Sequence, residues 1–181
     1  IDFLTASAHK FHGPKGIGFL YASSMDFDSY LHGGDQEQKK RAGTENLAAI
    51  VGMVAALKED LEKQKEHFQH IQNLETSFLA ELEDIQYYLN RGEHQLPYVL
   101  NIGFPGQKND LLLLRLDLAG ISISTGSACT AGIVQSSHVL EAMYGANSER
   151  LKESVRISLS PENTVEDLHT LAKTLKEIIG G

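Results

Sequence analysis

Hydrophobic residues alternate with polar ones at the start of this 181-residue chain, and further on they recur at a helical interval. Residues 2–6 and the stretch GIGFLYAS (16–23) have the alternation of short strands. An alanine-rich helix is predicted from Leu47, with Thr44 or Asn46 as its N-terminal cap. The helix continues into a charged run whose apolar residues lie near helical spacing: Leu57, Leu61, Phe68, Ile71, Leu74, Phe78 and Leu82.

The second half of the chain mixes strand and helix patterns. Strands are expected at IQYYLN (85–90), PYVLNIGF (97–104), ISIS (121–124) and SVRISLS (154–160). Helices are expected at NDLLLLRLDLAG (109–120), around residues 136–144 and at PENTVEDLHTLAKTLKEII (161–179). The expected caps are Asn109 for the first of these helices, which Gly120 ends, and Asn163 for the last, with Glu166 three residues on.

These elements predict an α/β chain in two parts. The composition shifts over Glu59–Lys65, inside the long helical segment, and we place a domain boundary between residues 62 and 63. Residues 63–181 are predicted to form an antiparallel sheet covered by helices, which is an α+β arrangement.

Composition narrows the classes of function. The formal net charge of −8 argues against a nucleic-acid-binding surface. No apolar run is long enough to cross a membrane, because Arg115 and Asp117 interrupt the most apolar stretch. The single cysteine, Cys129, excludes an internal disulfide and favours a reducing, cytoplasmic compartment. The first residues lack a secretory signal, and a chain that opens on Ile1 is expected to be a fragment of a longer protein.

A lysine lies in an unusually constrained stretch, SAHKFHGPKGIGFLY (7–21). A lysine whose pKa is lowered by burial or by cationic neighbours can condense with an aldehyde, so Lys10 is a candidate nucleophile. Ser7 and His9 add donors suited to a phosphate, and the nearby glycines allow a ligand to approach the backbone closely. The stretch therefore fits a site for pyridoxal phosphate, which has both an aldehyde and a phosphate. A surface hairpin with an exposed lysine fits the same residues equally well.

Three further positions are candidates for binding or chemistry. Thr44, in RAGTEN (41–46), offers a hydroxyl for an anion at a helix start, or simply marks a capped helix. Cys129, in STGSACTAG (124–132), fits a reactive thiolate, or a small residue buried in a turn. Arg156 suits a bidentate grip on a carboxylate, although an exposed strand arginine is as common. The histidine pairs at i, i+3 spacing lack partners with metal-ligand spacing, and His67 and His70 are expected to be solvated.

Four of these stretches, taken in their order along the chain, resemble the motifs of a known enzyme family. SAHKFHGPKGIGFLY, HGGDQEQKKRAGTEN, STGSACTAG and VRISLSPENTVED together resemble the cysteine desulfurases of the NifS/IscS family, which are class V aminotransferase-like enzymes of pyridoxal-phosphate fold type I. The resemblance covers essentially the whole chain. The short GSACT form of the cysteine loop is similar to the NifS/IscS group rather than to the SufS-like group.

The resemblance implies a role for each candidate. Lys10 would be the Schiff-base lysine, and Ser7 and His9 would hold the cofactor phosphate. Thr44 is similar to the threonine that reaches the phosphate from the partner subunit of a homodimer. Cys129 would take sulfur from L-cysteine as a persulfide, leaving L-alanine, and Arg156 would bind the substrate carboxylate. Sulfur would then pass to acceptor proteins for iron–sulfur cluster assembly or tRNA thiolation.

The resemblance also implies a domain assignment. Residues 1–62 would be the end of the large cofactor domain, and residues 63–181 the small domain with the cysteine loop. The family's acid opposite the pyridine nitrogen is not matched in this chain, since Asp2 lies too close to Lys10. Two other interpretations remain open: another class V enzyme, such as a selenocysteine lyase or an aminotransferase, or a non-catalytic interaction module.

Overall fold

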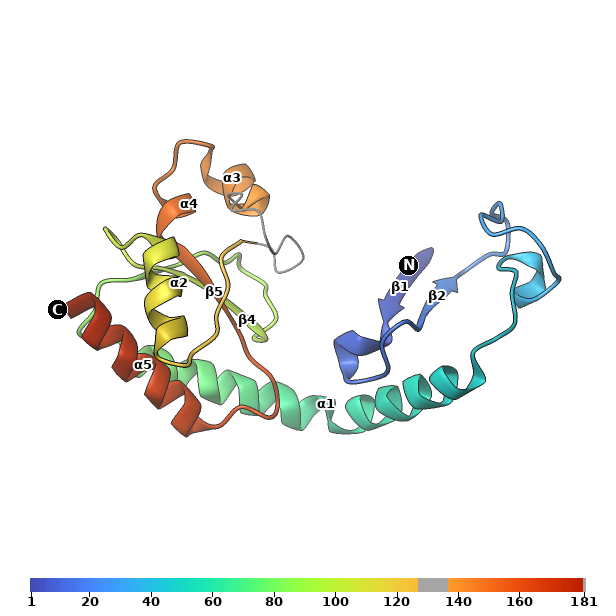
Figure 1. The fold of residues 1–181 in the computed structure, drawn as a ribbon, viewed down its shortest axis with the longest axis horizontal. Helices are drawn as coiled ribbons and strands as arrows, with labels where there is room; N and C mark the ends of the chain where they lie inside the picture. Colours follow the sequence, from blue (N-terminus) through green and yellow to red (C-terminus); the bar gives the residue numbers. More distant parts are fainter. Residues whose placement is uncertain (127–136, 181) are drawn as a thin grey trace. The chain divides into compact units, whose positions relative to one another are not determined.

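A computed structural model describes residues 1–126 and 137–180 of the chain (Figure 1). The chain divides into two compact units, residues 1–65 and 66–181, and the division falls inside helix α1 (Leu47–Glu81).

The first unit begins with an antiparallel hairpin. Strand β1 (Phe3–Ser7) pairs with β2 (Gly18–Ala22), and Thr5 lies opposite Leu20. A side chain at Gly18 would collide with the carbonyl oxygen of Ala6, so a glycine is required where the strands meet. A short 3-10 helix, η1 (Ala8–Phe11), lies between the strands and ends at a left-handed His12, with φ 64°.

A loop with a second 3-10 turn, η2 (Glu37–Lys39), leads from the hairpin to α1. The helix begins at Leu47, as predicted, and its cap is the side chain of Asn46, whose Oδ1 accepts a hydrogen bond from the Ala49 amide at 3.2 Å. Thr44 is therefore not the cap.

The second unit is built on a three-stranded antiparallel sheet in the order β3 (Tyr88–Leu89), β4 (Val99–Gly103) and β5 (Ser154–Ser158). The described part of this unit also contains helices α2 (Asn109–Leu118), α3 (His138–Tyr144), α4 (Arg150–Glu153) and α5 (Val165–Gly180). The α+β architecture expected for this part of the chain is confirmed, and the α/β class of the whole chain with it.

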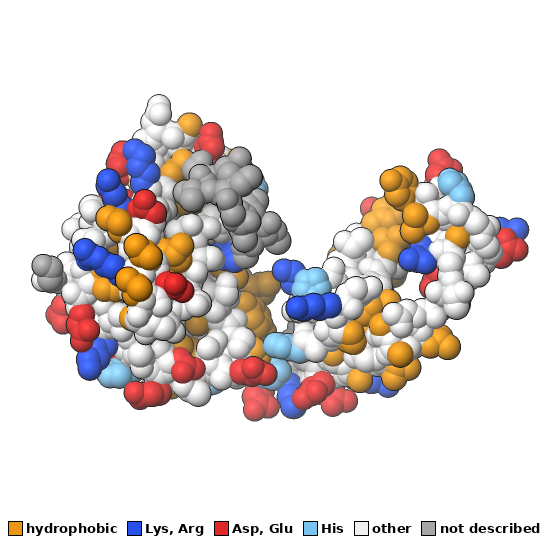
Figure 2. All heavy atoms as spheres, in the orientation of Figure 1, with side chains coloured by type: hydrophobic (Ala, Val, Ile, Leu, Met, Phe, Trp, Pro, Cys, Tyr) orange, Lys and Arg blue, Asp and Glu red, His pale blue; other side chains and the backbone are white. Residues whose placement is uncertain are grey.

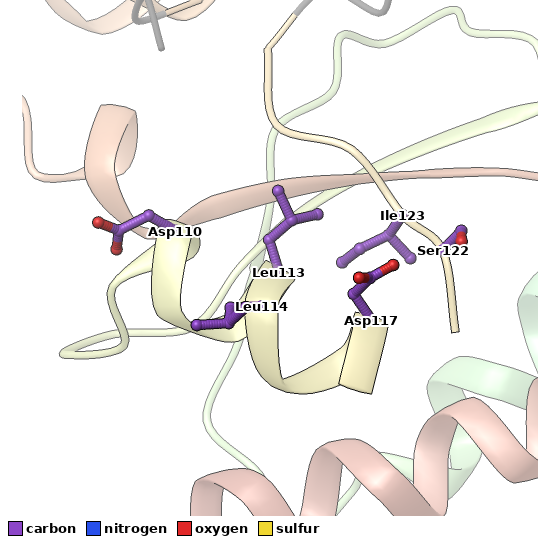
Figure 3. Close-up of a pocket in the computed structure, with 6 residues that line it drawn as sticks. All are labelled: Asp110, Leu113, Leu114, Asp117, Ser122 and Ile123. Atoms are coloured by element: carbon purple, nitrogen blue, oxygen red, sulfur yellow. The ribbon is translucent and has the colours of Figure 1, made fainter. Parts of the chain in front are cut away.

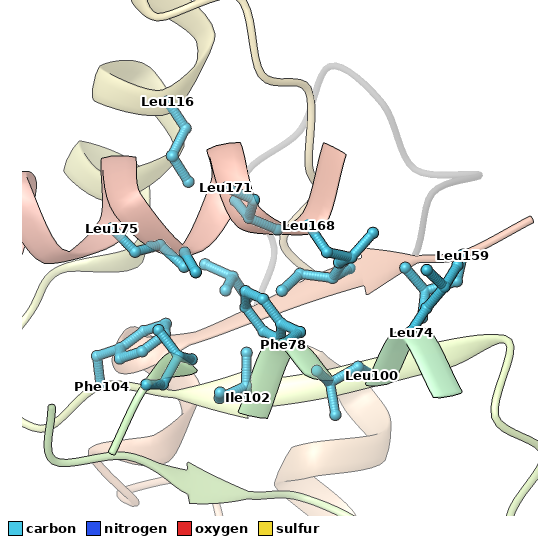
Figure 4. Close-up of a cluster of buried hydrophobic side chains, with 14 of the residues drawn as sticks. Leu74, Phe78, Leu100, Ile102, Phe104, Leu116, Leu159, Leu168, Leu171 and Leu175 are labelled. Atoms are coloured by element: carbon cyan, nitrogen blue, oxygen red, sulfur yellow. The ribbon is translucent and has the colours of Figure 1, made fainter. Parts of the chain in front are cut away.

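Leucine, isoleucine and phenylalanine side chains fill the core on one face of this sheet (Figure 4). Leu100 and Ile102 of β4 and Val155 and Ile157 of β5 alternate toward that face, as the period of two requires. Helices cover them with side chains that include Leu74 and Phe78 of α1, Leu112 and Leu116 of α2, and Leu168, Leu171 and Leu175 of α5. The opposite, polar face of the sheet carries Asn101, Ser154, Arg156 and Ser158, together with Tyr88, Val99 and Gly103.

Two expected caps are wrong. Helix α5 starts one residue later than Asn163 predicts, because Thr164 and Asp167 exchange hydrogen bonds: the Thr164 amide donates to Asp167 Oδ2 and the Asp167 amide donates to Thr164 Oγ1. Asn109 does not cap α2. Its Nδ2 instead donates to the carbonyl oxygens of Leu151 and Ser154, which ties the start of α2 to the end of α4.

Two short strands and one histidine also differ from the expectation. The strand at 85–90 is reduced to two residues, and 121–124 contributes a single bridge, from Ser124 to Arg156, rather than a strand. His70 is not simply solvated: it is partly buried, and its Nε2 lies 2.9 Å from the carbonyl oxygen of Asn163.

The two units differ sharply in how much apolar surface each one buries. Among the described hydrophobic residues of the first unit only Ala8 and Met53 are buried, while Phe3, Leu20, Tyr21, Leu47 and Val51 are at least half exposed. Hydrophobic side chains accordingly appear in orange on the surface of the protein (Figure 2). The remaining buried hydrophobic residues belong to the second unit. Among the described helices, none is both long and apolar enough to cross a lipid bilayer.

Candidate active-site residues in the two units

Ser7, His9 and Lys10 project from one tight turn in the first unit. The turn is closed by two backbone hydrogen bonds, from the Ala8 amide to the Ile17 carbonyl at 3.0 Å and from the Gly13 amide to the Ala8 carbonyl at 2.9 Å. The buried Ala8 anchors it, so the residues on either side of Ala8 are held at the surface. This unit therefore has both the surface hairpin and the exposed lysine that the alternative interpretation of the sequence expects.

The polar side chains of this turn are not used to hold the fold. Ser7, His9 and Lys10 are exposed, and their side chains make no hydrogen bond to any described residue. A hydroxyl, an imidazole and an amine grouped in this way are donors available to a phosphate and a nucleophile available to an aldehyde. The donor set present here thus fits a cofactor that has both groups.

Thr44 lies between a short bridge, Leu31 to Arg41, and the start of α1. Its hydroxyl is exposed and makes no hydrogen bond to a described residue, since Asn46 caps the helix. Among the described residues, no hydrogen bond joins Thr44 to Ser7, His9 or Lys10. Its expected role at a phosphate stays a prediction.

Arg156 lies in the middle of β5 on the polar face of the sheet. Its backbone amide donates to the Ser124 carbonyl at 2.6 Å and its carbonyl accepts from the Ser124 amide at 3.1 Å. On the other side β4 places Asn101 directly opposite. The backbone of Arg156 is therefore held by neighbouring segments on both sides, so the position from which its side chain extends is fixed.

The guanidinium of Arg156 is poorly satisfied by its surroundings. Nη1 donates one long hydrogen bond to the carbonyl oxygen of Gly126 at 3.4 Å, and the buried Nε has no hydrogen-bond partner among the described residues. No described carboxylate forms an ion pair with the guanidinium. Buried donors are nearly always paired in native proteins, and the planar fork of a guanidinium is suited to a carboxylate.

Cys129 lies outside the described residues. The described chain reaches Gly126 and resumes at Ser137, so the expected role of this cysteine stays a prediction. Among the described residues no group of three or more potential ligands could hold a metal ion.

A polar array that the sequence analysis missed covers the same face of the sheet as Arg156. The Arg150 guanidinium is held between the rings of Tyr88 and Tyr144, with its carbon 4.2 Å and 4.4 Å from their centres. Its Nη1 donates to Asn90 Oδ1 at 2.9 Å. Asn90 Nδ2 then donates to Asn101 Oδ1 at 2.8 Å and to Ser154 Oγ at 2.7 Å.

Tyr88 closes one end of this array. Burial raises the pKa of the Tyr88 phenol above its ordinary value of 10.0, and the hydrogen bond to Ser154 and the charge of Arg150 oppose this only in part, while Glu153 raises the pKa further. The phenol therefore stays protonated and donates to Glu153 Oε2 at 3.1 Å. A side chain at residue 103 would collide with the Tyr88 ring, which explains Gly103 opposite it in β4.

A surface pocket of the second unit lies away from these residues. A shallow pocket of about 310 Å³ lies beside α2, lined by Asp110, Leu113, Leu114, Asp117, Ser122 and Ile123 (Figure 3). Its charged groups are two carboxylates and it holds no cation. It is therefore a poor place for a phosphate or a carboxylate, and the predicted site residues are not among those that line it.

Comparisons with known proteins place the chain among enzymes of one kind. A family model for class-V aminotransferases matches residues 1–171. The chain is 46% identical over 183 residues to a protein of Bacillus subtilis (strain 168) named putative cysteine desulfurase IscS 1, and 38% identical to the cysteine desulfurase IscS of Dictyoglomus turgidum. These matches cover 99% of the chain but only 48% and 46% of the two relatives.

Solved structures agree with the sequence relatives. A NifS-like protein is similar with a TM-score of 0.86 and 32% identity over 99% of the chain, and a NifS-like protein from Rickettsia africae with 0.85 and 30% over 100%. A structure described as SspA in complex with cysteine is similar with a TM-score of 0.65 and 34% identity over 91% of the chain. The chain spans about half the length of each of these proteins.

Proposed function

The chain belongs to the class-V aminotransferase family, and from this membership we propose that it supplies the reactive lysine and cysteine of a pyridoxal-phosphate-dependent cysteine desulfurase. The relatives support this reaction, since the two most similar of those named above are called cysteine desulfurases. The structural observation that carries the proposal is the guanidinium of Arg156, whose buried Nε has no partner among the described residues and whose fork of donors suits the carboxylate of an amino-acid substrate.

The proposed cofactor site lies in the first unit. Lys10 would supply the amine that bonds the cofactor aldehyde, and the hydroxyl of Ser7 and the ring of His9 would donate to its phosphate. When bound, pyridoxal phosphate supplies an electron sink for the carbon chemistry of the substrate. Thr44 is proposed to reach the phosphate of the partner subunit in a homodimer, which fits a hydroxyl that no described residue uses.

The proposed sulfur transfer belongs to the second unit. Arg156 would hold the carboxylate of L-cysteine, while the thiolate of Cys129 attacks the substrate sulfur. A sulfur–sulfur bond forms as the carbon–sulfur bond breaks. The electron pair of the broken bond stays with the carbon fragment, which takes up a proton and leaves as L-alanine. The persulfide then remains on Cys129 for transfer to an acceptor.

The proposal extends to the domains, the sulfur acceptors and the compartment. We assign residues 1–62 to the cofactor domain and residues 63–181 to the small domain. The acceptors would serve iron–sulfur cluster assembly or tRNA thiolation, in the cytoplasm. A selenocysteine lyase or an aminotransferase would share Lys10 and Arg156, and turnover with cysteine, selenocysteine and keto acids separates these activities.

Replacing Cys129 with serine in the intact protein tests the proposal. Cofactor binding should be kept, but persulfide formation should be lost, because a hydroxyl is a far poorer nucleophile toward sulfur than a thiolate. Trapping the persulfide with an alkylating reagent and measuring alanine release are the assays. Ser127→Ala, in the same stretch, is the matched control and should keep both. Undiminished persulfide labelling in the Cys129→Ser protein would refute the assignment.

A further inference from the structure

The guanidinium of Arg150, which can only donate hydrogen bonds, fixes the orientation of the carboxamides of Asn90 and Asn101. An arginine has no hydrogen-bond acceptor, so the Asn90 atom that Arg150 Nη1 contacts at 2.9 Å must be the oxygen, Oδ1. Arg150 itself cannot turn away, because it is held between the rings of Tyr88 and Tyr144. The Nδ2 hydrogens of Asn90 must therefore point toward acceptors on its other side.

Asn90 passes this orientation to Asn101. Asn90 is only 7% exposed, and its two Nδ2 hydrogens are used by Asn101 Oδ1 at 2.8 Å and by Ser154 Oγ at 2.7 Å. Turning the Asn101 carboxamide over would set two donors against each other in this buried place. Asn101 is therefore held with its oxygen toward Asn90 and its Nδ2 on the side away from Asn90.

Asn101 Nδ2 is left with its hydrogens unused by any described residue. Asn101 and Arg156 lie directly opposite each other in the β4–β5 ladder, and directly opposed residues of an antiparallel pair share a face. On that face Arg156 has a buried Nε without a described partner and one long hydrogen bond from Nη1 to the Gly126 carbonyl. Two opposed residues of the sheet thus have donors that no described residue uses.

We propose that Asn101 binds the substrate carboxylate together with Arg156, with Asn90 and Arg150 as the residues that hold its donors in place. This inference rests on the proposed function, because Arg156 is taken there as the carboxylate site. A guanidinium can hold a carboxylate through two parallel hydrogen bonds, and the Nδ2 donor of Asn101 would add a further hydrogen bond from a separate side chain. The ligand class is an α-amino acid with a free carboxylate.

The test compares substrates with and without that negative charge. Asn101→Asp keeps the oxygen that faces Asn90 and replaces only the Nδ2 donors by a negative oxygen, so the array stays intact. In the intact, cofactor-loaded protein, KM for L-cysteine should rise about 10- to 100-fold, the loss expected for a hydrogen bond to a charged group. KM for L-cysteine methyl ester should stay within about threefold. Asn147→Asp, an exposed residue in the same unit, adds the same charge as a control and should change neither value.

A binding measurement separates this inference from the proposed function. Calorimetric titration with L-alanine and with L-alaninamide reports on the carboxylate site even if no cysteine is turned over. If the wild-type protein releases no alanine from L-cysteine, the proposed function fails, while weaker L-alanine binding by the Asn101→Asp protein still supports the carboxylate role. Asn101→Ala, measured in the same way, should lose about tenfold for L-alanine only. Equal binding of L-alanine by wild type and both variants, or equal losses for L-alanine and L-alaninamide in folded protein, would overturn the inference.

Discussion

The guanidinium carbon of Arg150 lies 4.2 Å from the centre of the Tyr88 ring, which joins the short helix α4 to the edge strand β3. A flat cation on an aromatic face gains electrostatic attraction and packing together. Arg150 also stacks on Tyr144 of α3 and donates to Asn90 next to β3, so one side chain links α3, α4 and the β3 segment.

Arg150→Lys should therefore destabilise the protein by about 1–2 kcal/mol, because an ammonium cannot stack between two rings and reach Asn90 at the same time. Urea unfolding followed by far-UV circular dichroism measures the change. Arg91→Lys is the matched control: its partner, Glu75, is bound at 2.7 Å by an exposed arginine, and the loss there should stay below about 0.5 kcal/mol. A loss for Arg150→Lys no larger than for Arg91→Lys would show that the stacking contributes nothing.

Arg156→Lys should weaken binding of L-cysteine and leave cofactor binding unchanged. A lysine cannot reproduce the planar fork of donors, and losing one member of a charge-assisted pair costs about 2–5 kcal/mol. The apparent affinity for L-cysteine, measured from the absorbance of the bound cofactor, checks this. Arg115→Lys, at an exposed arginine of α2, is the control that should behave as wild type. An unchanged affinity in the Arg156→Lys protein would count against the carboxylate site.

The reciprocal cap of α5 predicts a pH-dependent stability. The Thr164 amide and hydroxyl hold the pKa of Asp167 below its ordinary value of 3.8. A lowered carboxylate pKa adds stability that is present above the unfolded pKa and is lost as the pH falls through the folded pKa. Asp167→Asn should thus lower Tm at pH 7, and the difference from wild type should shrink below about pH 4.

Thermal unfolding from pH 7 down to pH 2.5 measures this difference. Glu166→Gln removes a neighbouring charge of the same first turn that makes no hydrogen bond to a described residue, and it should leave Tm almost unchanged. A gap between wild type and Asp167→Asn that is the same at pH 7 and at pH 2.5 would contradict the role of the charged carboxylate.

The contrast in burial predicts that the second unit folds alone and the first does not. Residues 66–181 contain the whole buried cluster, and should unfold in one cooperative transition. Residues 1–65 bury only Ala8 and Met53 among their hydrophobic residues, and should show no such transition. Phe78→Ala, which costs about 3–5 kcal/mol in a core, should abolish the folding of residues 66–181. Cooperative unfolding of residues 1–65 by themselves would be the contrary result.

Elements whose signal is local were predicted well. Helix α1 begins at Leu47 as the pattern indicates, and α2 ends at Leu118, close to the Gly120 that was expected to end it. The cap of α5 was misplaced by one residue because Asn163 and Thr164 are both good caps with an acid three residues on. The function of Asn109 was missed because its partners lie 42 and 45 residues away, where no local pattern reports on them.

Some residues of the candidate site follow from the local sequence pattern, and others depend on contacts between distant parts of the chain. Strand alternation accounts for the position of Arg156, because Val155 and Ile157 point to the core and leave Arg156 on the opposite face. The array of Asn90, Asn101 and Arg150 was missed because it depends on strand register and on a contact across 60 residues. The one signal for it was a polar Asn101 between the apolar Leu100 and Ile102, which marks a residue on the other face of its strand.

The hairpin of β1 and β2 has a practical consequence for handling the protein. Both strands are sheet edges within the described residues, so each presents unpaired amides and carbonyls along one side. Phe3, Leu20 and Tyr21 add exposed apolar side chains to these edges. Short apolar strands with open edges are templates for intermolecular β-pairing, so this hairpin is where self-association of the isolated chain would begin as its concentration rises.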